Sequence, residues 1–160
     1  MKNKAIFLDR DGVINFERGY THRLEDFVIH PDLMEVLKIL KQKGYLLIVI
    51  SNQSGIAKGL YLQSETEVLH RFLINELDKH NLFFDEIYYC VHHPDVGNCI
   101  CRKPDSLFVE KALARFNIDA SKSYFIGDKE RDIESGAKAG VTGILIEANI
   151  SLKTILNRIV

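Results

Sequence analysis

Short apolar segments alternate with amphipathic segments along the chain, and this alternation most restricts the possible fold. The apolar segments have the length and composition of buried strands, and the amphipathic segments have the spacing of apolar side chains typical of helices. Strands that alternate with helices indicate an α/β protein with a mainly parallel sheet flanked by helices. We therefore predict five strands, at residues 5–8, 45–50, 86–90, 123–126 and 143–146.

The helices are placed from their capping residues and apolar periodicity. Asp32 is the expected N-cap of the first helix, which Gly44 ends. Ser64 and Glu67 match a capping box that opens a second helix reaching about residue 80. Further helices are expected at residues 105–116, 131–139 and 151–158.

Length and composition limit the class of protein. A chain of 160 residues suits a single domain, residues 1–160, with one core. The formal net charge of −1 gives no reason to expect a nucleic-acid partner. The N-terminal apolar stretch is too short for a signal sequence, and no apolar run approaches the roughly 18 residues that cross a membrane. We expect a cytoplasmic monomer that binds neither nucleic acid nor membrane.

Polar residues follow three of the predicted strands at their carboxyl ends. Asp9 and Asp11 follow the first strand, residues 51–53 follow the second, and Asp128 with Lys129 follows the fourth. In open parallel sheets the ligand site lies outside the carboxyl ends of the strands. These three clusters are therefore expected to converge on one edge of the sheet.

The acidic members of these clusters predict a cation site. Carboxylates gathered at one edge repel each other, and a bound cation relieves that repulsion. Hard oxygen ligands with open coordination positions suit Mg²⁺, and they leave room for water and a phosphate oxygen. The predicted magnesium ligands are Asp9, Asp11 and Asp128. For Asp9 and Asp11 taken alone, helix capping or simple solvation remains the alternative.

Groups suited to an anion accompany the acidic residues. Ser51 offers a hydroxyl, Asn52 an amide, and the turn at Gly55 offers backbone N–H groups that can face a phosphate. Lys103 and Lys129 supply positive charge. Taken alone, Lys103 is better explained as an ordinary surface lysine, but its position beside Pro104 and a cluster of cysteines favours a place in the site.

Four motifs in order resemble those of the haloacid dehalogenase (HAD) superfamily of phosphatases. They are Asp9-Arg10-Asp11-Gly12-Val13, Ser51-Asn52-Gln53-Ser54-Gly55, Arg102-Lys103-Pro104, and Gly127-Asp128-Lys129 followed by Asp132. The resemblance covers residue 5 to about residue 146 and implies a HAD-like sheet. It also implies that Asp9 attacks phosphorus to form an aspartyl-phosphate, while Asp11 serves as general acid and base. Asp132 either holds metal-bound water or faces solvent.

The same resemblance assigns the remaining central groups. Mg²⁺ is held by Asp9, Asp128 and the backbone carbonyl of Asp11, and it neutralises charge on the transferred phosphoryl group. Ser51 and Lys103 bind the oxygens of that group. The spans between the motifs leave no room for the separate cap domain that many members carry.

All the cysteines of the chain lie in one segment, residues 90–104. With one histidine they form the pattern C-x-H-x₆-C-x-C, whose four ligands suit a closed tetrahedral Zn²⁺ site. The predicted ligands are Cys90, His92, Cys99 and Cys101. His92 is preferred to His93 because residues i and i+2 of an extended chain project to the same side. Such a zinc is structural and orders the loop; the alternative is three free thiols that cluster by chance.

This loop resembles the zinc-bearing branch of the superfamily, whose members hydrolyse a heptose bisphosphate or histidinol phosphate. Gly19-Tyr20, residues 54–59 and His92-His93-Pro94 are more similar to the heptose enzymes. Substrate contacts are then implied for Glu17, Arg18, Gly19, Tyr20, Ser51, Asn52, Gln53, Ser54, Arg102 and Lys103. Tyr20 could instead be a packed aromatic residue. Val13 and Ser51 stand where threonine is common, and the span between His92 and Cys99 is shorter than in some relatives.

The expected function is therefore a Mg²⁺-dependent phosphatase that removes the 7-phosphate of a heptose bisphosphate, a small sugar phosphate. Hydrolysis of histidinol phosphate is the first alternative. A non-catalytic phospho-accepting switch is the second, although a switch has no use for a built-in acid such as Asp11. A zinc-stabilised binding module is the third, and it leaves the three carboxylates unexplained.

Overall fold

The computed structural model describes residues 2–160, and its five strands form one sheet. The strands are β1 (Lys4–Leu8), β2 (Tyr45–Asn52), β3 (Glu86–Cys90), β4 (Tyr124–Gly127) and β5 (Thr142–Leu145). Their order is β3-β2-β1-β4-β5, and every neighbouring pair is parallel. The α/β prediction is confirmed, and each predicted strand is present with its ends shifted by at most two residues.

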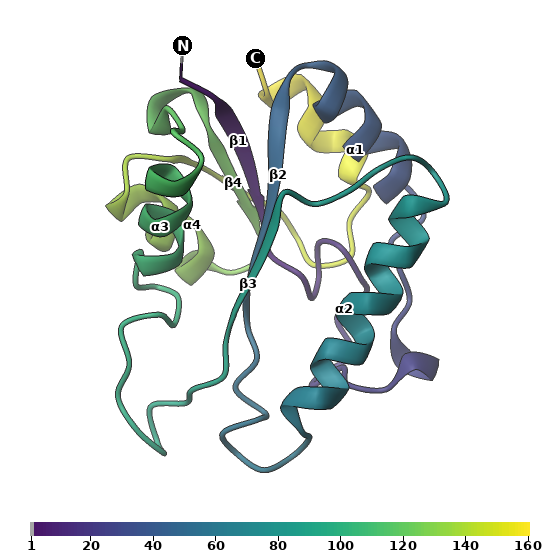
Figure 1. Ribbon diagram of the computed structural model, residues 1–160, viewed down its shortest axis with the longest axis vertical. Coiled ribbons are helices and arrows are strands. Elements are labelled where there is room, and N and C mark those ends of the chain that lie inside the picture. The colour runs from purple at the N-terminus through teal and green to yellow at the C-terminus, as the bar shows by residue number, and fades with distance from the viewer. Residues whose placement is uncertain (1) are drawn as a thin grey trace.

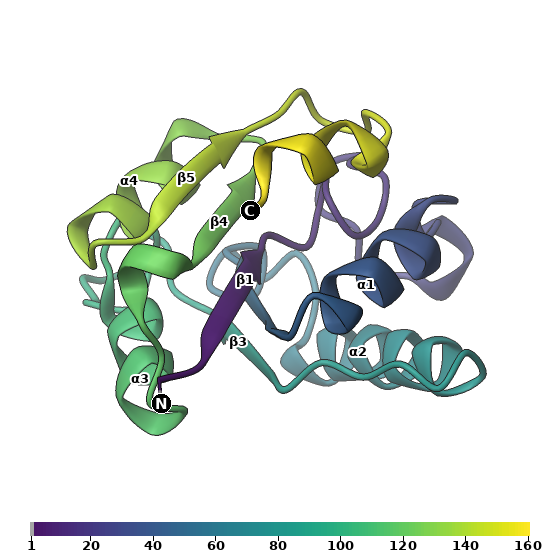
Figure 2. The same ribbon diagram turned by 90° about the horizontal axis from the view of Figure 1, so that it is seen from above.

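Helices cover both faces of the sheet. The α-helices are α1 (Leu33–Gln42), α2 (Gln63–Asp78), α3 (Leu107–Arg115) and α4 (Glu130–Lys138). Helices α1 and α2 lie on one side of the sheet and α3 and α4 on the other, as Figures 1 and 2 show from two directions. Short 3₁₀ helices complete the fold: η1 (Leu24–Asp26), η2 (Ala120–Lys122) and η3 (Leu152–Arg158).

Two predicted helix starts are wrong in their capping. Helix α2 begins after Leu62, whose backbone N–H donates to the Glu65 carboxylate at 2.7 Å. Glu67, expected to close a capping box with Ser64, instead accepts a hydrogen bond from the Tyr89 hydroxyl at 3.1 Å. Asp32 does precede α1, but its carboxylate makes no capping bond there and accepts one from the Ser151 hydroxyl.

The closing segment is a 3₁₀ helix, η3, where a helix was expected at residues 151–158. Leu152 and Ile155 are both buried, three positions apart. A 3₁₀ helix places residues i and i+3 in line, so this geometry directs both side chains into the core.

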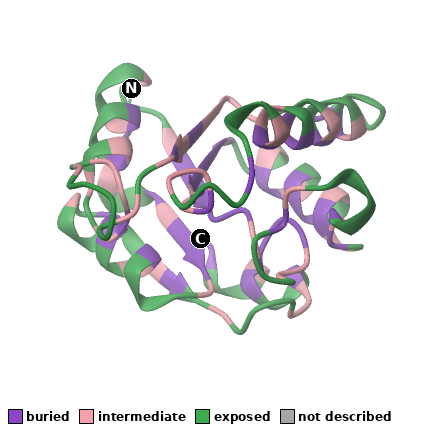
Figure 3. Cartoon of the chain, turned by 90° about the horizontal axis from the view of Figure 1, so that it is seen from below, coloured by how far each residue is buried: buried purple, intermediate pink, exposed green. Residues whose placement is uncertain are grey.

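Two apolar clusters enclose the sheet, which explains why its strands read as continuous apolar runs. Ile6 and Leu8 of β1 belong to the cluster under α1, α2 and η3, whereas Ala5 and Phe7 belong to the cluster under α3. Successive side chains of a strand point to opposite faces, so both faces of β1 are buried. Only the strand ends remain for ligands; Figure 3 looks onto that end, with buried strands at the centre of the view.

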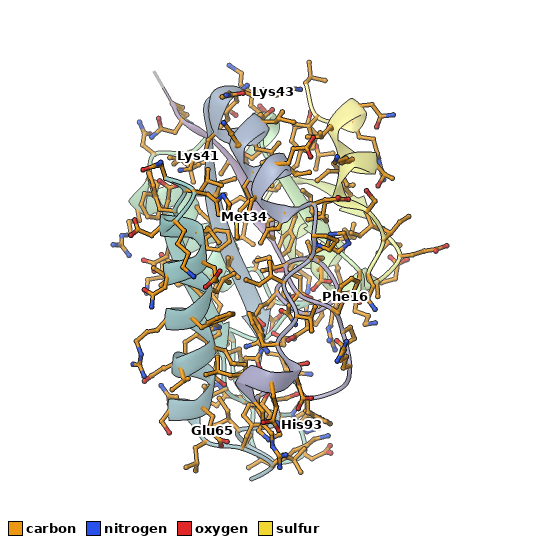
Figure 4. All side chains as sticks on the ribbon, turned by 90° about the vertical axis from the view of Figure 1, so that its right-hand side faces the viewer. Phe16, Met34, Lys41, Lys43, Glu65 and His93 are labelled. Atoms are coloured by element: carbon orange, nitrogen blue, oxygen red, sulfur yellow. The ribbon has the colours of Figure 1, made fainter. Side chains whose placement is uncertain are left out.

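The strand order brings the polar clusters together. β1 is the central strand, with β2 on one side and β4 on the other, so their carboxyl ends are adjacent. In Figure 4, Glu65 and His93 mark the end of the molecule where the strand-end loops gather, and Lys43 marks the opposite end. Between β1 and α1 the described chain holds only η1 and no separate lobe. None of the helices in residues 2–160 has the length and apolar character needed to cross a membrane.

Candidate active site

Asp9 lies directly after β1 and is 6% exposed. Its Oδ1 accepts hydrogen bonds from the backbone N–H of Arg10 and the ammonium of Lys103, both at 2.8 Å. Burial raises the pKa of the Asp9 carboxyl to about 7, although the charge of Lys103 opposes the shift. A further positive charge beside Asp9, in addition to Lys103, would therefore favour its ionised form at neutral pH.

Lys103 is buried, and the prediction that it belongs to the site is supported over a surface lysine. Its ammonium lies within 2.8 Å of three oxygens, which belong to the carboxylates of Asp9 and Asp132 and the carbonyl of Ile50. Burial lowers the pKa of Lys103, but the two carboxylates outweigh it and the net direction is upward. Lys103 therefore stays charged.

Asp132 is fully buried, so the alternative that it faces solvent is wrong. Its Oδ1 lies 2.7 Å from the ammonium of Lys103, and its Oδ2 accepts from the backbone N–H of Lys129 at 3.1 Å. Gly127 makes this placement possible, because a Cβ there would lie 2.2 Å from the Cβ of Asp132.

Asp9, Asp128 and Asp132 each offer a carboxylate oxygen, and the three oxygens lie within 4.8 Å of one another. Within the described residues Asp128 Oδ1 is buried without a hydrogen-bond partner, and Oδ2 meets the Lys129 ammonium at 2.9 Å. A Cβ at Gly12 would lie 2.8 Å from Oδ2, so the glycine lets this carboxylate sit against the backbone. A buried carboxylate oxygen without a donor suits a divalent cation with oxygen ligands.

The carboxylate of Asp11 lies outside this group and is held by three side chains. Arg10 Nη2 lies 2.9 Å from Oδ2, Asn15 Nδ2 donates to Oδ1 at 2.9 Å, and Gln53 Nε2 donates to Oδ2 at 3.0 Å. Burial raises the pKa of the Asp11 carboxyl, but the Arg10 charge and these hydrogen bonds outweigh it and the net direction is downward. Because the carboxylate of Asp11 is engaged in this way, the atom of Asp11 that could bind magnesium is its backbone carbonyl oxygen.

Ser51 and Gln53 are buried at the end of β2, beside Asp11. Gln53 Nε2 donates to Ser51 Oγ at 2.7 Å as well as to Asp11. Asn52 is arranged differently: its Nδ2 donates to the Lys103 carbonyl and its Oδ1 accepts from the Lys103 N–H, both at 3.0 Å. The Asn52 amide therefore anchors the backbone of Lys103, a role that the sequence did not indicate.

The other expected substrate residues are half-buried or exposed. The Glu17 carboxylate accepts from the Gly19 N–H at 2.7 Å, while the Glu17 N–H donates to Asn149 Oδ1 at 2.7 Å. Tyr20 is 47% exposed and accepts a hydrogen bond from Lys58 at 3.1 Å, so the packed-aromatic alternative is wrong. Exposed or half-buried positions are also taken by Arg18, Ser54, Arg102 and Lys129.

The cysteine-containing loop after β3 forms a second cluster. Its members, whose ligand atoms lie within 4.8 Å of one another, are Cys90, His92, Cys99 and Cys101. Cys90 Sγ lies 3.7 Å from Cys99 Sγ, 3.2 Å from Cys101 Sγ and 3.5 Å from His92 Nδ1. Tetrahedral bonds of about 2.3 Å to sulfur and about 2.0 Å to nitrogen place two sulfurs about 3.8 Å apart and a sulfur about 3.5 Å from the nitrogen. The cluster therefore has the size of a zinc site.

This cluster adjoins the first site. The Gln53 N–H donates to the carbonyl of Cys90 at 2.7 Å, and Arg102 Nη1 donates to the carbonyl of His92 at 3.2 Å. His93 lies outside the cluster, as predicted. Burial raises the pKa of the Cys90 thiol, so a thiolate there requires a cation beside it.

Three residues of the site were missed by sequence reasoning. Arg10 and Asn15 hold Asp11, and the Tyr61 hydroxyl donates to Gln53 Oε1 at 2.8 Å. The position of Asn15, four residues after Asp11 in the first motif, is a signal that could have indicated it. Nothing local in the sequence points from Tyr61 to Gln53, because the loop between them sets that contact.

Two acids at the end of the central strand, with a serine, a lysine and a further acid from adjacent segments, define a phosphatase of the HAD type. A family model described as "HAD-hyrolase-like" matches residues 100–159. The chain is also similar to curated proteins named D-glycero-beta-D-manno-heptose-1,7-bisphosphate 7-phosphatase. One from Helicobacter pylori is 43% identical over 153 residues, covering 95% of this chain and 87% of the relative. One from Haemophilus ducreyi is 39% identical over 153 residues, covering 91% and 84%.

A Campylobacter jejuni relative named for the alpha form of the sugar is 40% identical over 149 residues, covering 93% of this chain and 84% of the relative. Among solved structures, the D,D-heptose 1,7-bisphosphate phosphatase of B. bronchiseptica, complexed with magnesium and phosphate, superposes with a TM-score of 0.84. It is 29% identical, and the match covers 96% of this chain and 86% of that one. The chain belongs to the family of D-glycero-D-manno-heptose-1,7-bisphosphate 7-phosphatases.

Proposed function

We propose that the chain removes the 7-phosphate from D-glycero-D-manno-heptose 1,7-bisphosphate in a Mg²⁺-dependent reaction through an aspartyl-phosphate. The observation that carries this proposal is the set of groups around Asp9 at the end of β1. Its carboxylate accepts a hydrogen bond from the Lys103 ammonium and lies in one group with Asp128, whose Oδ1 is buried without a partner. Relatives named for the alpha and the beta sugar both match, so the proposal covers either anomer.

Substrate binding uses groups from the neighbouring strands. The Ser51 hydroxyl and the Lys103 ammonium bind oxygens of the transferred phosphoryl group. Asp9, Asp128 and the carbonyl of Asp11 would hold Mg²⁺, which neutralises charge on that group. The unsatisfied Asp128 oxygen supports this assignment. The sugar is contacted by Glu17, Arg18, Gly19, Tyr20, Gln53, Ser54 and Arg102. Asn52 holds the backbone of Lys103, and the Lys129 ammonium pairs with the Asp128 carboxylate.

The chemistry has two steps. An oxygen of Asp9 attacks phosphorus and the bond from phosphorus to the sugar oxygen breaks, while the Asp11 carboxyl gives its proton to that leaving oxygen. Water then attacks the phosphorus of the aspartyl-phosphate, and the Asp11 carboxylate takes the proton of the water. Inorganic phosphate leaves and Asp9 is regenerated.

The cysteine loop is proposed to bind structural Zn²⁺ through Cys90, His92, Cys99 and Cys101. All four positions of a tetrahedral ion are then filled by protein, so this zinc orders the loop and takes no part in the reaction. Its effect on the chemistry comes through Arg102 and Lys103, which follow the last ligand. Because every proposed group comes from one chain, the enzyme is expected to work as a monomer.

Phosphate release from the heptose bisphosphate and from histidinol phosphate, each with Mg²⁺, tests the proposal. A clear preference in kcat/KM for the heptose bisphosphate is expected. Preference for histidinol phosphate would assign the alternative substrate. A stable phosphorylated protein without multiple turnovers would point to a phospho-accepting switch.

A further inference from the structure

We infer that Tyr61 is a positioning residue for the general acid: its hydroxyl holds the Gln53 amide, which in turn holds Asp11 and Ser51. The inference rests on the proposed function, because it concerns the part that Asp11 plays in that reaction. Within the described residues Tyr61 makes no hydrogen bond to Asp11, and it acts on Asp11 through Gln53.

A continuous chain of hydrogen bonds connects these residues. The Tyr61 hydroxyl donates to Gln53 Oε1 at 2.8 Å. Gln53 Nε2 then donates to Asp11 Oδ2 at 3.0 Å and to Ser51 Oγ at 2.7 Å. Tyr61 is 5% exposed and Gln53 is buried too, so water does not compete readily for these bonds. One amide thus connects the loop after β2 with both the acid and the phosphate-binding hydroxyl.

The amide can hold the ionised form of Asp11 in one orientation. With Asp11 ionised, an amide turned over would place its oxygen against the carboxylate, where both groups accept and neither donates. A donor facing Oε1 favours the productive orientation and keeps the amide from shifting. Tyr61 is suited to that task because burial raises the pKa of its phenol to about 12, so the hydroxyl keeps its proton.

Two contacts fix the ring of Tyr61. It stacks on the imidazole of His22, with the ring centres 5.0 Å apart and the planes at 4°. A Cβ at Gly55 would lie 2.1 Å from the ring, so the ring packs directly on the backbone of the second motif. The hydroxyl therefore has little freedom to leave Gln53. A glycine is required at position 55 because any side chain there would collide with the Tyr61 ring.

Tyr61→Phe removes the hydroxyl and keeps the ring. Sugar oxygens leave poorly without a proton, whereas 4-nitrophenolate leaves readily, so a displaced acid costs more with the sugar substrate. We expect kcat/KM to fall about tenfold with the heptose bisphosphate and less than about twofold with 4-nitrophenyl phosphate. Tyr89→Phe is the matched control: its hydroxyl bonds Gln63 and Glu67 on α2, and both kcat/KM values should stay unchanged.

A double-mutant cycle separates positioning from general damage. In a Gln53→Met background the phenol has no amide to hold, so adding Tyr61→Phe should cause no further loss. Solvent exchange of the Gln53 side-chain amide, followed by NMR, should be faster in Tyr61→Phe than in the wild type and in Tyr89→Phe.

Equal losses with the two substrates, a loss that adds fully to that of Gln53→Met, or an unchanged exchange rate of the Gln53 amide would each overturn the inference. Absence of phosphate release by the wild type would instead refute the proposed function. In that case the amide exchange still decides whether Tyr61 holds Gln53.

Discussion

At the scale of single residues, Asp9 and Asp11 show how one motif supplies two different carboxyl groups. Burial pushes the pKa of Asp9 up to about 7 despite Lys103, whereas Arg10, Asn15 and Gln53 bring the pKa of Asp11 down. To act as a nucleophile Asp9 must be ionised, and a cation in addition to Lys103 favours that form. To act as an acid Asp11 must gain a proton despite Arg10, and the negative charge of a bound phosphate favours that form.

Asp11→Asn keeps the shape of the side chain but cannot give or take the proton. We expect kcat to fall by roughly 10²–10⁴-fold while binding of inorganic phosphate is retained. Steady-state kinetics and phosphate titration measure the two effects. Asp119→Asn, an acid beside η2 at the opposite end of the sheet, is the control and should leave kcat unchanged. A normal kcat in Asp11→Asn would contradict the acid–base role.

The raised pKa of Asp9 predicts how pH and Mg²⁺ act on stability. Without metal the folded protein holds a proton on Asp9 that the unfolded chain releases near pH 4, so stability falls as pH rises towards about 7. Mg²⁺ requires the carboxylate and therefore competes with this proton. The rise in Tm on adding Mg²⁺ should be larger at about pH 8 than at about pH 5.5. An equal rise at both pH values, or a rise of the same size in Asp9→Asn, would be inconsistent with Mg²⁺ at Asp9.

At the scale of elements, the sequence predicts the strands and the polar clusters but not the contacts between distant loops. Periodicity and composition are local properties, so β1 to β5 could be placed within two residues. The cap of α2 was misplaced because Glu67 is engaged by Tyr89, and the carboxylate of Asp32 is engaged by Ser151. Such partners are chosen by the tertiary fold. The contact of Tyr61 with Gln53 was missed for the same reason.

The turn after β2 offers a test at this scale. In Gly55→Ala the new methyl group would lie 2.1 Å from the Tyr61 ring, so ring and turn must shift. We expect the free energy of unfolding in urea to fall by about 1–3 kcal/mol, the usual cost of overpacking. Gly97→Ala is the control, because its Cβ would have no heavy atom within 4 Å and stability should not fall. Equal stability of the two variants would show that the ring is not fixed against Gly55.

The loop after β3 offers a second test at this scale, which compares substitutions of the adjacent residues His92 and His93. His92→Gln should reduce the zinc content and lower Tm, because binding energy at this site is folding energy for the loop. Activity should fall as well, since small displacements of positioning groups such as Arg102 can cost about 10²-fold. His93→Gln should leave all three unchanged. Metal analysis and thermal unfolding of both variants check this, and a wild type without zinc would show the cysteine cluster to be incidental.

At the scale of the whole molecule, the sheet order determines what can meet at the site. β1 lies between β2 and β4, so groups from three chain segments far apart in sequence reach one edge. β3 lies beyond β2 and brings the cysteine loop to the same edge. Both faces of the sheet are buried under helices. Selectivity for a sugar phosphate must therefore come from the loops around that edge, because residues 2–160 contain no separate covering lobe.

The central claim is that Asp9 accepts the phosphoryl group, and mass spectrometry of enzyme quenched in acid during turnover tests it most directly. Heptose bisphosphate with Mg²⁺ should leave one added phosphoryl group, located on the peptide that contains Asp9. Asp9→Asn should show neither that group nor turnover. A phosphoryl group on another residue, or turnover by Asp9→Asn, would contradict the account.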